Sequence, residues 1–493
     1  MTRRSLTGNA VSGVAWLMVY QVGRQLLSFV SVAVLARKVP PSAYGLVAMA
    51  SVLTAFFDNF RDMGTIYSII REREVSDRLL SSIFWLNLGL GLVLSLAIVL
   101  LAFPISAFFH QPALRPVTQV LAITFFLYSL GVLPTGLLTR AMTFRPLAIS
   151  QLTGAVIGTA AAIIAAVAGA GVWSLVLGTL VSTFTTTIGL WIVCSWRPRF
   201  LMDWGEIRSI ASYSMNLSGS NLLVYFSRNA DNLIVGRFLG DVALGYYQMA
   251  YTLMLYPIVN ISSVIAGAVF PAFASLQDDD VRFRAAFTRT CMLIGLITVP
   301  LMLGLMAVAG PVVEVVLGAK WRPVASLLLV FAPLGMFQSI NTMMALACQA
   351  KGRSDLLFRW SLFSSAIYVA SFFIGLPWGI QGVANSYAAA WMLLMVPGFT
   401  ISFRVVGLPW REFLTAMWPE LAAGMAMVAV VLIWRFALDR AGVSSSAVHL
   451  FSAVAVGCVS YIGMLMFWKP PVVAEAGAIL EDKGYTRLAR LLS

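Results

Sequence analysis

Polar side chains recur at helical spacing inside a long apolar stretch of this sequence, residues 208–237. They are Ser214, Ser218, Asn221, Tyr225, Arg228 and Asn232. Residues three and four positions apart lie on one face of an α-helix, so these side chains form a single polar stripe. Amide and hydroxyl groups bind sugar hydroxyls, and an arginine fork binds phosphate or carboxylate oxygens through paired hydrogen bonds. The stripe therefore predicts a site for a polar, anionic ligand.

A second polar stripe lies in the apolar stretch 11–36. Its members are Gln21, Gln25 and Ser28, which align at a shift of 200 residues with Asn221, Tyr225 and Arg228. Arg24 lies beside this stripe. If both stripes face one central cavity, each contributes an arginine to it. Two structural alternatives stay open. Arg24 could snorkel to a membrane interface, and Arg228 could pair with Asp231 on the same helix.

Acidic residues in these stretches are candidates for ion coupling. Asp231 lies within the first stripe, and Asp58 lies near the end of the stretch 42–62. Coupling to a proton or sodium gradient would use one of these two carboxylates. The four cysteines are far apart and the two histidines are isolated, so we expect no metal site and no cofactor. We also expect no catalytic residues.

The elements that carry these side chains are predicted to cross a membrane. Of 493 residues, 60% are hydrophobic and 11% are charged, whereas soluble proteins have about 25% charged residues. Apolar runs of about 20 residues, enough for one span each, recur along the chain. We therefore predict an all-α polytopic membrane protein with about fourteen transmembrane helices. The predicted spans are 11–36, 42–62, 79–103, 116–139, 147–169, 171–194, 208–237, 242–268, 286–309, 324–348, 356–376, 379–403, 413–437 and 447–468.

Basic residues are distributed unevenly between the two sides of these spans. With the N-terminus inside, the cytoplasmic segments hold 23 of the 33 Lys and Arg residues, the opposite side holds 8, and 2 lie within spans. Cytoplasmic loops carry such an excess of Lys and Arg. The bias predicts that both termini are cytoplasmic. It also accounts for most of the net charge of +13 without nucleic acid as a partner.

Two segments of the chain match each other at a shift of 200 residues. Residues 35–53 align with 235–253, which places Arg37 on Arg237 and Gly45 on Gly245. A second match, at a shift of 207 residues, places Arg115-Pro116-Val117 on Arg322-Pro323-Val324. Both matches keep their order and span number, so they predict two parallel six-helix halves, an architecture of transporters. The predicted parts are an N-terminal six-helix lobe at 1–200, a C-terminal six-helix lobe at 201–405, two additional transmembrane helices at 406–468 and a cytoplasmic tail at 469–493.

Several short motifs resemble a family of polysaccharide exporters. They are Leu244-Gly245-Tyr246-Tyr247, Ala250-Tyr251, Phe270-Pro271-Ala272-Phe273, Gln277-Asp278-Asp279, Asp231 followed by Asn232-Leu233-Ile234-Val235-Gly236-Arg237, and the segment 69–91. They are similar to Wzx-type polysaccharide flippases, in the branch that exports colanic acid, succinoglycan or xanthan-type units. The resemblance implies the multidrug/oligosaccharidyl-lipid/polysaccharide (MOP) superfamily and a MATE/MurJ-like fold.

The same resemblance implies a function and a set of partners. The chain would be a flippase that moves undecaprenyl-diphosphate-linked oligosaccharide repeat units across the bacterial inner membrane for exopolysaccharide biosynthesis. It would do so by alternating access through a cationic central cavity. The expected partners are this lipid-linked sugar, membrane lipid, and the polysaccharide polymerase and export machinery.

Two other classes of function stay open. A cation-coupled multidrug antiporter of the same superfamily should favour buried carboxylates and aromatic residues, whereas the two deepest predicted charges here are Arg24 and Arg228. A membrane enzyme of polysaccharide assembly usually needs a sizeable loop or domain that holds its acid, base or metal ligands. The predicted loops are short, so we favour a transporter that is not an enzyme.

Overall fold

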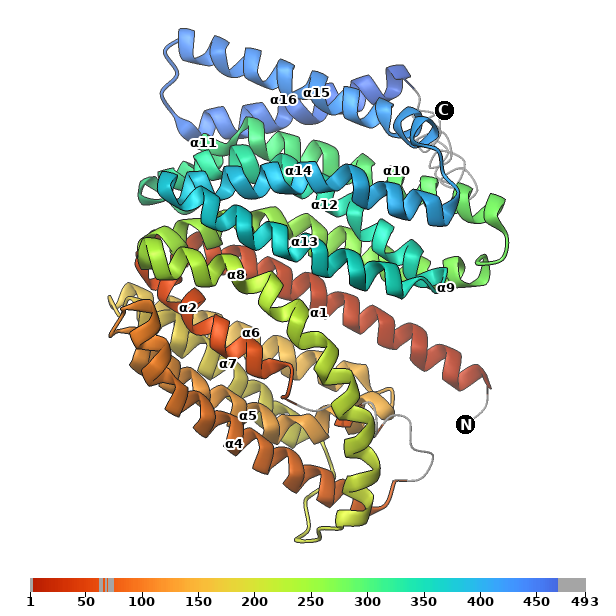
Figure 1. Ribbon diagram of the computed structural model, residues 1–493. Coiled ribbons are helices and arrows are strands. Elements are labelled where there is room, and N and C mark those ends of the chain that lie inside the picture. The colour runs from red at the N-terminus through yellow and green to blue at the C-terminus, as the bar shows by residue number, and fades with distance from the viewer. Residues whose placement is uncertain (1–2, 62–64, 67–68, 70–74, 469–493) are drawn as a thin grey trace. The chain divides into compact units, whose positions relative to one another are not determined.

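The computed structural model describes residues 3–61, 65, 66, 69 and 75–468, and in residues 3–12, 14, 15, 17 and 204–228 it describes the backbone alone. Every regular element of this part of the chain is a helix (Figure 1). The predicted all-α class is therefore confirmed. The cytoplasmic tail predicted at 469–493 lies outside the described residues.

The helices of the first part of the chain alternate with short connections. They are α1 (Arg3–Lys38), α2 (Pro41–Asp58), α4 (Asp77–Phe109), α5 (Leu114–Arg140), α6 (Phe144–Val167), α7 (Val172–Val193) and α8 (Trp204–Pro257). The later helices are α9 (Ser263–Ser275), α10 (Asp280–Ala307), α11 (Ala309–Val312), α12 (Arg322–Ala350), α13 (Ser354–Gly375), α14 (Gly379–Val406), α15 (Trp410–Arg440) and α16 (Ser446–Trp468). Short π or 3-10 turns join several of them: η1 (Ile258–Ser262), η2 (Val313–Leu317), η3 (Ala319–Trp321) and η4 (Leu376–Trp378).

Twelve helical stretches among the described residues are long and apolar enough to cross a membrane. One of them, Ser354–Val406, contains both α13 and α14. Another, Asn229–Ser275, begins after the part of α8 whose backbone alone is described. The chain is thus a multi-pass membrane protein, and the number of fourteen spans stays a prediction.

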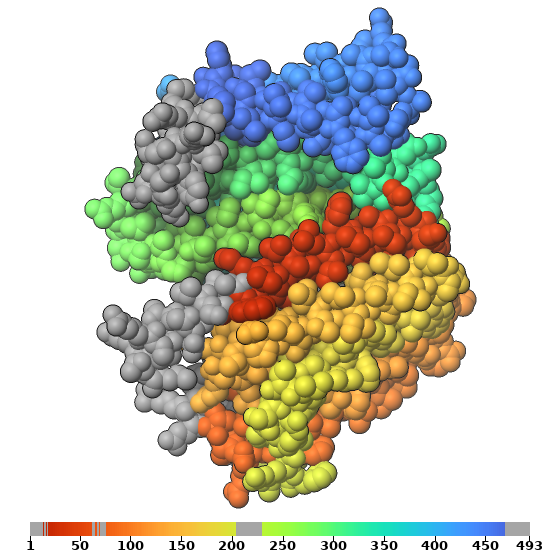
Figure 2. Space-filling model, turned by 180° about the vertical axis from the view of Figure 1, so that it is seen from behind, coloured from red at the N-terminus to blue at the C-terminus, as the bar shows by residue number. Residues whose placement is uncertain are grey.

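The chain divides into two compact units, residues 1–245 and 246–493. The predicted lobes, with a boundary at residue 200, stay a prediction. In the first unit α1 packs on α6, α6 on α7, α7 on α5, and α5 on α4 and α2. Figure 2 shows α1, in red, lying along α6, in amber.

The contact between α6 and α7 depends on small residues. A Cβ atom added at Gly158 would lie 2.5 Å from the Ser182 Cβ and 2.7 Å from the Gly178 carbonyl oxygen. A Cβ atom added at Gly178 would lie 2.7 Å from the Ala162 Cβ. Small residues let membrane helices approach closely, and close packing stabilises helix pairs where lipid offers no hydrophobic driving force.

In the second unit α10 packs against both α12 and α15, while α13 pairs with α14 and α15 with α16. Phe283, Phe287 and Cys291 of α10 lie in one buried cluster with Phe413 and Met417 of α15. The predicted additional helices at 406–468 therefore dock on α10. At the start of α10, the Asp279 side chain accepts a hydrogen bond from the Arg282 backbone amide at 3.1 Å and so caps the helix.

Candidate functional site

The polar residues of α1 lie on a face of their own. At about 100° per residue, Gln21, Arg24 and Gln25 fall on one side of the helix, and Val22 and Leu26 fall on another. Arg24 is exposed, and so are Val22 at 60% and Leu26 at 65%. The apolar side suits lipid. A guanidinium on the polar side needs water, an anion or a partner instead, because a charge at the bilayer centre costs about 2.5–3.5 kcal/mol on insertion scales.

The packed side of α1 is a third face. A Cβ atom added at Gly23 would lie 3.0 Å from the Leu152 Cδ1 of α6. Gly23 lies about half a turn from Gln21, so the polar side does not face α6 there. The predicted stripe of α1 therefore does not face its packing partner at this level, and its place in a cavity stays a prediction.

The second predicted stripe is described in part. The side chains of Asn221, Tyr225 and Arg228 lie outside the described residues, so their place in a cavity stays a prediction. Asp231 is 4% exposed, and its Oδ1 accepts a hydrogen bond from the Asn232 backbone amide at 2.8 Å. The Asn232 side-chain oxygen is buried without a hydrogen-bond partner among the described residues. Asp231 is thus a buried, hydrogen-bonded carboxyl, and Asn232 is half-buried with its side-chain oxygen buried.

Asp58, the other candidate for ion coupling, is engaged with Arg61. The Arg61 Nη1 lies 3.1 Å from the Asp58 Oδ1, and the side chains are 25% and 46% exposed. The Arg61 guanidinium also lies 3.5 Å from the centre of the Tyr128 ring and 5.4 Å from that of Phe125, both on α5. Arg61 therefore links the end of α2, through Asp58, with two aromatic rings of α5. The spacing of three residues is typical of a pair on one helix face, but nothing in the sequence pointed to the aromatic partners.

The internal repeat reappears as a reciprocal contact within the first unit. A Cβ atom added at Gly45 of α2 would clash with the Asp241 carbonyl, and one added at Gly245 would clash with the Pro41 carbonyl. Under the 200-residue shift, Gly45 corresponds to Gly245 and Pro41 to Asp241. In each repeat the equivalent glycine therefore contacts the equivalent carbonyl of the other repeat, as in a twofold interface.

The helix is interrupted at the equivalent point of each repeat. Pro40 precedes α2 in an extended conformation, with φ −71° and ψ 155°. Gly240 breaks α8 with φ 84°, a conformation that side-chain-bearing residues rarely adopt. Different residue types therefore produce the same break ahead of the two contact glycines.

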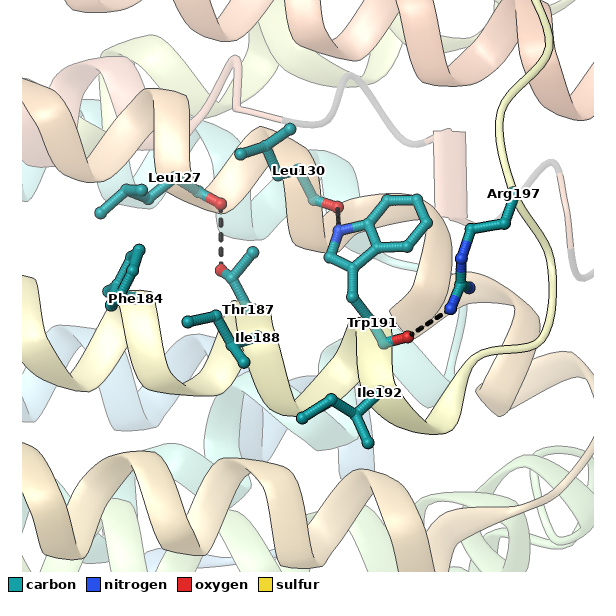
Figure 3. A pocket seen from close by; sticks show the side chains of 8 residues that line it. All are labelled: Leu127, Leu130, Phe184, Thr187, Ile188, Trp191, Ile192 and Arg197. Carbon is teal, nitrogen blue, oxygen red and sulfur yellow. Dashed lines mark hydrogen bonds between the residues drawn. The ribbon is translucent and has the colours of Figure 1, made fainter.

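An apolar groove of about 410 Å³ runs between α5 and α7 (Figure 3). It is lined by Leu127, Leu130, Phe184, Thr187, Ile188, Trp191, Ile192 and Arg197. The Trp191 Nε1 donates to the Leu130 carbonyl at 3.0 Å, a carbonyl left free because Pro134 has no N–H. Arg197 donates to the carbonyls of Cys194, Trp196 and Trp191. Its guanidinium therefore caps the end of α7, and the groove itself offers mainly apolar surface.

A second cavity, of about 390 Å³, lies in the second unit among η2, α12, α15 and α16 and has charged walls. Glu314 accepts hydrogen bonds from the Ser446 hydroxyl at 2.9 Å and from the Arg322 guanidinium at 3.4 Å. These donors lower the pKa of the Glu314 carboxyl. His449 lies 2.8 Å from the Val443 carbonyl. The charged groups are largely paired, so this cavity is mixed rather than cationic.

The sequence pattern did not single out Glu420, which has an exposed fraction of 0%. An acidic residue within the apolar run of α15 is the signal by which the sequence could have identified it.

The described residues contain no group of three or more His, Cys, Asp or Glu side chains that could hold a metal ion.

Comparison with known sequences gives matches over most of the chain. The model of the family described as polysaccharide biosynthesis protein matches residues 34–326. The lipopolysaccharide biosynthesis protein WzxC of Escherichia coli K12 is 25% identical over 478 residues, which cover 96% of each chain. The succinoglycan biosynthesis transport protein ExoT of Rhizobium meliloti is 24% identical over 459 residues, 92% of each chain.

Comparison with solved structures concerns the fold. A structure of the lipid II flippase MurJ in an inward closed conformation matches with a TM-score of 0.73 and 14% sequence identity. The match covers 92% of this chain and 100% of that one. At this identity the likeness establishes the fold alone, and it confirms the predicted MATE/MurJ-like class.

Proposed function

This chain belongs to the polysaccharide biosynthesis protein family, and from that membership we propose that it is a flippase for lipid-linked sugars. Its substrate is an undecaprenyl-diphosphate-linked oligosaccharide repeat unit of an exopolysaccharide. It moves the headgroup from the cytoplasmic to the periplasmic leaflet of the bacterial inner membrane, with both termini of the chain in the cytoplasm. A polysaccharide polymerase and export machinery act on the product outside.

Similarity over almost the whole chain carries this proposal. The relatives that match 92% or more of the chain include proteins named for lipopolysaccharide biosynthesis and for succinoglycan biosynthesis transport. The matched fold is that of a protein named as a lipid II flippase. The names of ExoT and MurJ support a role in transport rather than in catalysis.

The polar face of α1 supports an anionic substrate. The diphosphate headgroup cannot enter hydrocarbon without losing its hydration, and burying an unpaired charge is costly. Arg24 provides a guanidinium that can replace water around phosphate oxygens. Gln21 and Gln25, on the same face, donate and accept hydrogen bonds with sugar hydroxyls. In the proposal Arg228, Asn221, Tyr225 and Asn232 act in the same way from α8, and the two helices line one cationic cavity.

The lipid tail takes a separate path in this proposal. An undecaprenyl chain is hydrocarbon and gains nothing from a polar cavity, so it stays in the bilayer beside the apolar helix faces. Access to the cavity alternates between the two leaflets, and the headgroup crosses while the tail turns over in lipid. Coupling to a proton or sodium gradient through Asp231 or Asp58 belongs to the same proposal.

The test is a leaflet assay with purified protein in liposomes. A fluorescent undecaprenyl-diphosphate oligosaccharide is placed in one leaflet, and its appearance in the other leaflet is measured. The Arg24→Gln variant keeps a polar side chain but removes the charge, and we expect at least a tenfold loss of flux, the effect of about 1.4 kcal/mol. Arg359→Gln is the matched control, because Arg359 is an exposed helical arginine at the start of α13, outside the proposed cavity.

The outcomes separate the function from the site. Flux by the wild type, lost in Arg24→Gln and kept in Arg359→Gln, supports both. Flux that is equal in all three proteins refutes the role of Arg24 but keeps the flippase. If no lipid-linked sugar moves, with or without an ion gradient, the flippase proposal fails and a labelled cationic drug becomes the substrate to test.

A further inference from the structure

Glu420 is a fully buried carboxyl in a membrane-spanning helix. It lies ten residues after the start of α15 at Trp410, and its exposed fraction is 0%. Neither of its carboxyl oxygens has a hydrogen-bond partner among the described residues. A buried ionised carboxylate is stable only when it is paired or hydrogen-bonded, and otherwise it takes up a proton.

The packing of α15 places Glu420 against α10. Met417, three residues earlier, touches the position where a Cβ of Gly295 would lie, with its Cε at 2.5 Å. Gly424, four residues later, faces Val299 and Leu303, whose atoms lie 2.5 and 3.0 Å from an added Cβ. Residues three and four apart share one helix face, so Glu420 faces α10 between these two contacts. The α10 residues at these two contacts carry no polar side chain.

The groups around Glu420 include no basic side chain that is hydrogen-bonded to it in the described part of the chain. From α16, Tyr461 lies within electrostatic range of Glu420. From α10, Cys291 lies in the buried cluster that contains Met417. On α15 itself, the charged pair of Glu412 with Arg284, at 3.8 Å, lies about two turns earlier. None of these groups offers Glu420 a compensating charge.

Two hydroxyl groups on the helices packed against α15 donate to backbone carbonyls rather than to Glu420. Pro300 has no N–H, so the Leu296 carbonyl of α10 lacks its helical partner, and the Tyr461 hydroxyl donates to that carbonyl at 3.1 Å. The Thr298 hydroxyl donates to the Ile294 carbonyl at 2.9 Å.

We propose that Glu420 is a proton-binding site: its carboxyl is protonated in the described conformation and exchanges that proton with water when the contact of α15 with α10 and α16 opens. The reaction is the gain or loss of one proton at a carboxylate oxygen, with water as the other partner. The use of this exchange to couple transport to a proton gradient rests on the proposed flippase function. For proton coupling, Glu420 is an alternative to Asp231 and Asp58, so loss of the response to a pH gradient in Glu420→Gln would leave those two residues without a role in it.

The first experiment observes the proton directly, without transport. Infrared spectra of the full-length protein in lipid are recorded at neutral pH in H₂O and in D₂O. The wild type should show the C=O stretch of a protonated carboxylic acid, shifted in D₂O. Glu420→Gln, a neutral side chain of the same size, should lack this band, and the control Glu412→Gln should keep it. A spectrum of Glu420→Gln with the full band overturns the assignment.

The second experiment tests coupling in liposomes. A pH gradient should accelerate lipid movement by the wild type and by Glu412→Gln, whereas Glu420→Gln should move lipid at one rate with and without the gradient. Stimulation by the gradient that persists in Glu420→Gln overturns the coupling role. If Glu420→Gln does not fold, Glu420→Asp retains the acid and should shift the band and alter the response to the gradient. If the wild type moves no lipid, the flippase proposal fails while the infrared result still decides the proton site.

Discussion

The reciprocal contact of Gly45 and Gly245 allows a quantitative test. An alanine methyl at either position overlaps a backbone carbonyl of the other repeat, at Asp241 or Pro41. Neither carbonyl can rotate away as a flexible side chain could, so the helices must separate. Overpacking of this kind costs about 1–3 kcal/mol, and alanine recovers about 0.5–1 kcal/mol of helix propensity over glycine. We expect each single substitution to lower the free energy of unfolding by roughly 1–2 kcal/mol.

The double substitution sharpens the test. Once one methyl has separated the helices, the second meets less resistance, so the double variant should lose less than the sum of the two single variants. Contacting residues show coupling of about 0.5–3 kcal/mol. Denaturant unfolding in mixed micelles gives these free energies. Gly89→Ala is the control, because an added Cβ there meets nothing within 4 Å.

Two results would refute the reasoning. One is additivity of the two single losses to within about 0.3–0.5 kcal/mol, as for distant independent sites. The other is a Gly45→Ala variant as stable as Gly89→Ala. Either would mean that the two glycines are not needed for a close crossing of the helices.

Three further predictions concern single side chains. Tyr461→Phe leaves the Leu296 carbonyl without a donor and should lower the free energy of unfolding by about 1–3 kcal/mol; unchanged unfolding in mixed micelles would contradict this. Arg61→Gln removes the cation above the Tyr128 ring and should lower the free energy of unfolding by about 1 kcal/mol in the same assay. If Arg61→Gln has no such effect in a Tyr128→Leu background, the two side chains interact as described. The pKa of Glu314 is lowered by its hydroxyl and guanidinium donors, so its stabilising effect is present above the ordinary pKa of a glutamate and disappears as the pH falls through the lower value of the folded protein. Glu314→Gln should therefore flatten the acid side of the stability–pH curve, and an unchanged curve would show that this carboxyl contributes nothing.

The fold class and the repeat could be predicted from the sequence because both depend only on composition and on the order of residues along the chain. The low charged fraction and the recurring apolar runs require lipid around the chain, and lipid permits helices with all backbone groups paired internally. The match of Gly45 with Gly245 identifies equivalent positions of the two repeats from residue order alone. The sequence could not show that each glycine faces a carbonyl of the other repeat, since a one-dimensional match contains no contacts.

The candidate site was accessible in part for the same reason. The polar face of α1, with Gln21, Arg24 and Gln25, follows from the period of a helix alone. Interactions between distant segments were not predictable. Arg61 stacks on Tyr128, and the Tyr461 hydroxyl donates a hydrogen bond to the carbonyl that Pro300 leaves without a helical partner. Glu420 is the clearest case. The sequence shows an acid in an apolar run, as it does for Asp58. The absence of a hydrogen-bond partner for its oxygens depends on the helices packed against α15. The free energy of a charge depends on the groups that surround it in space, and the sequence does not list those groups.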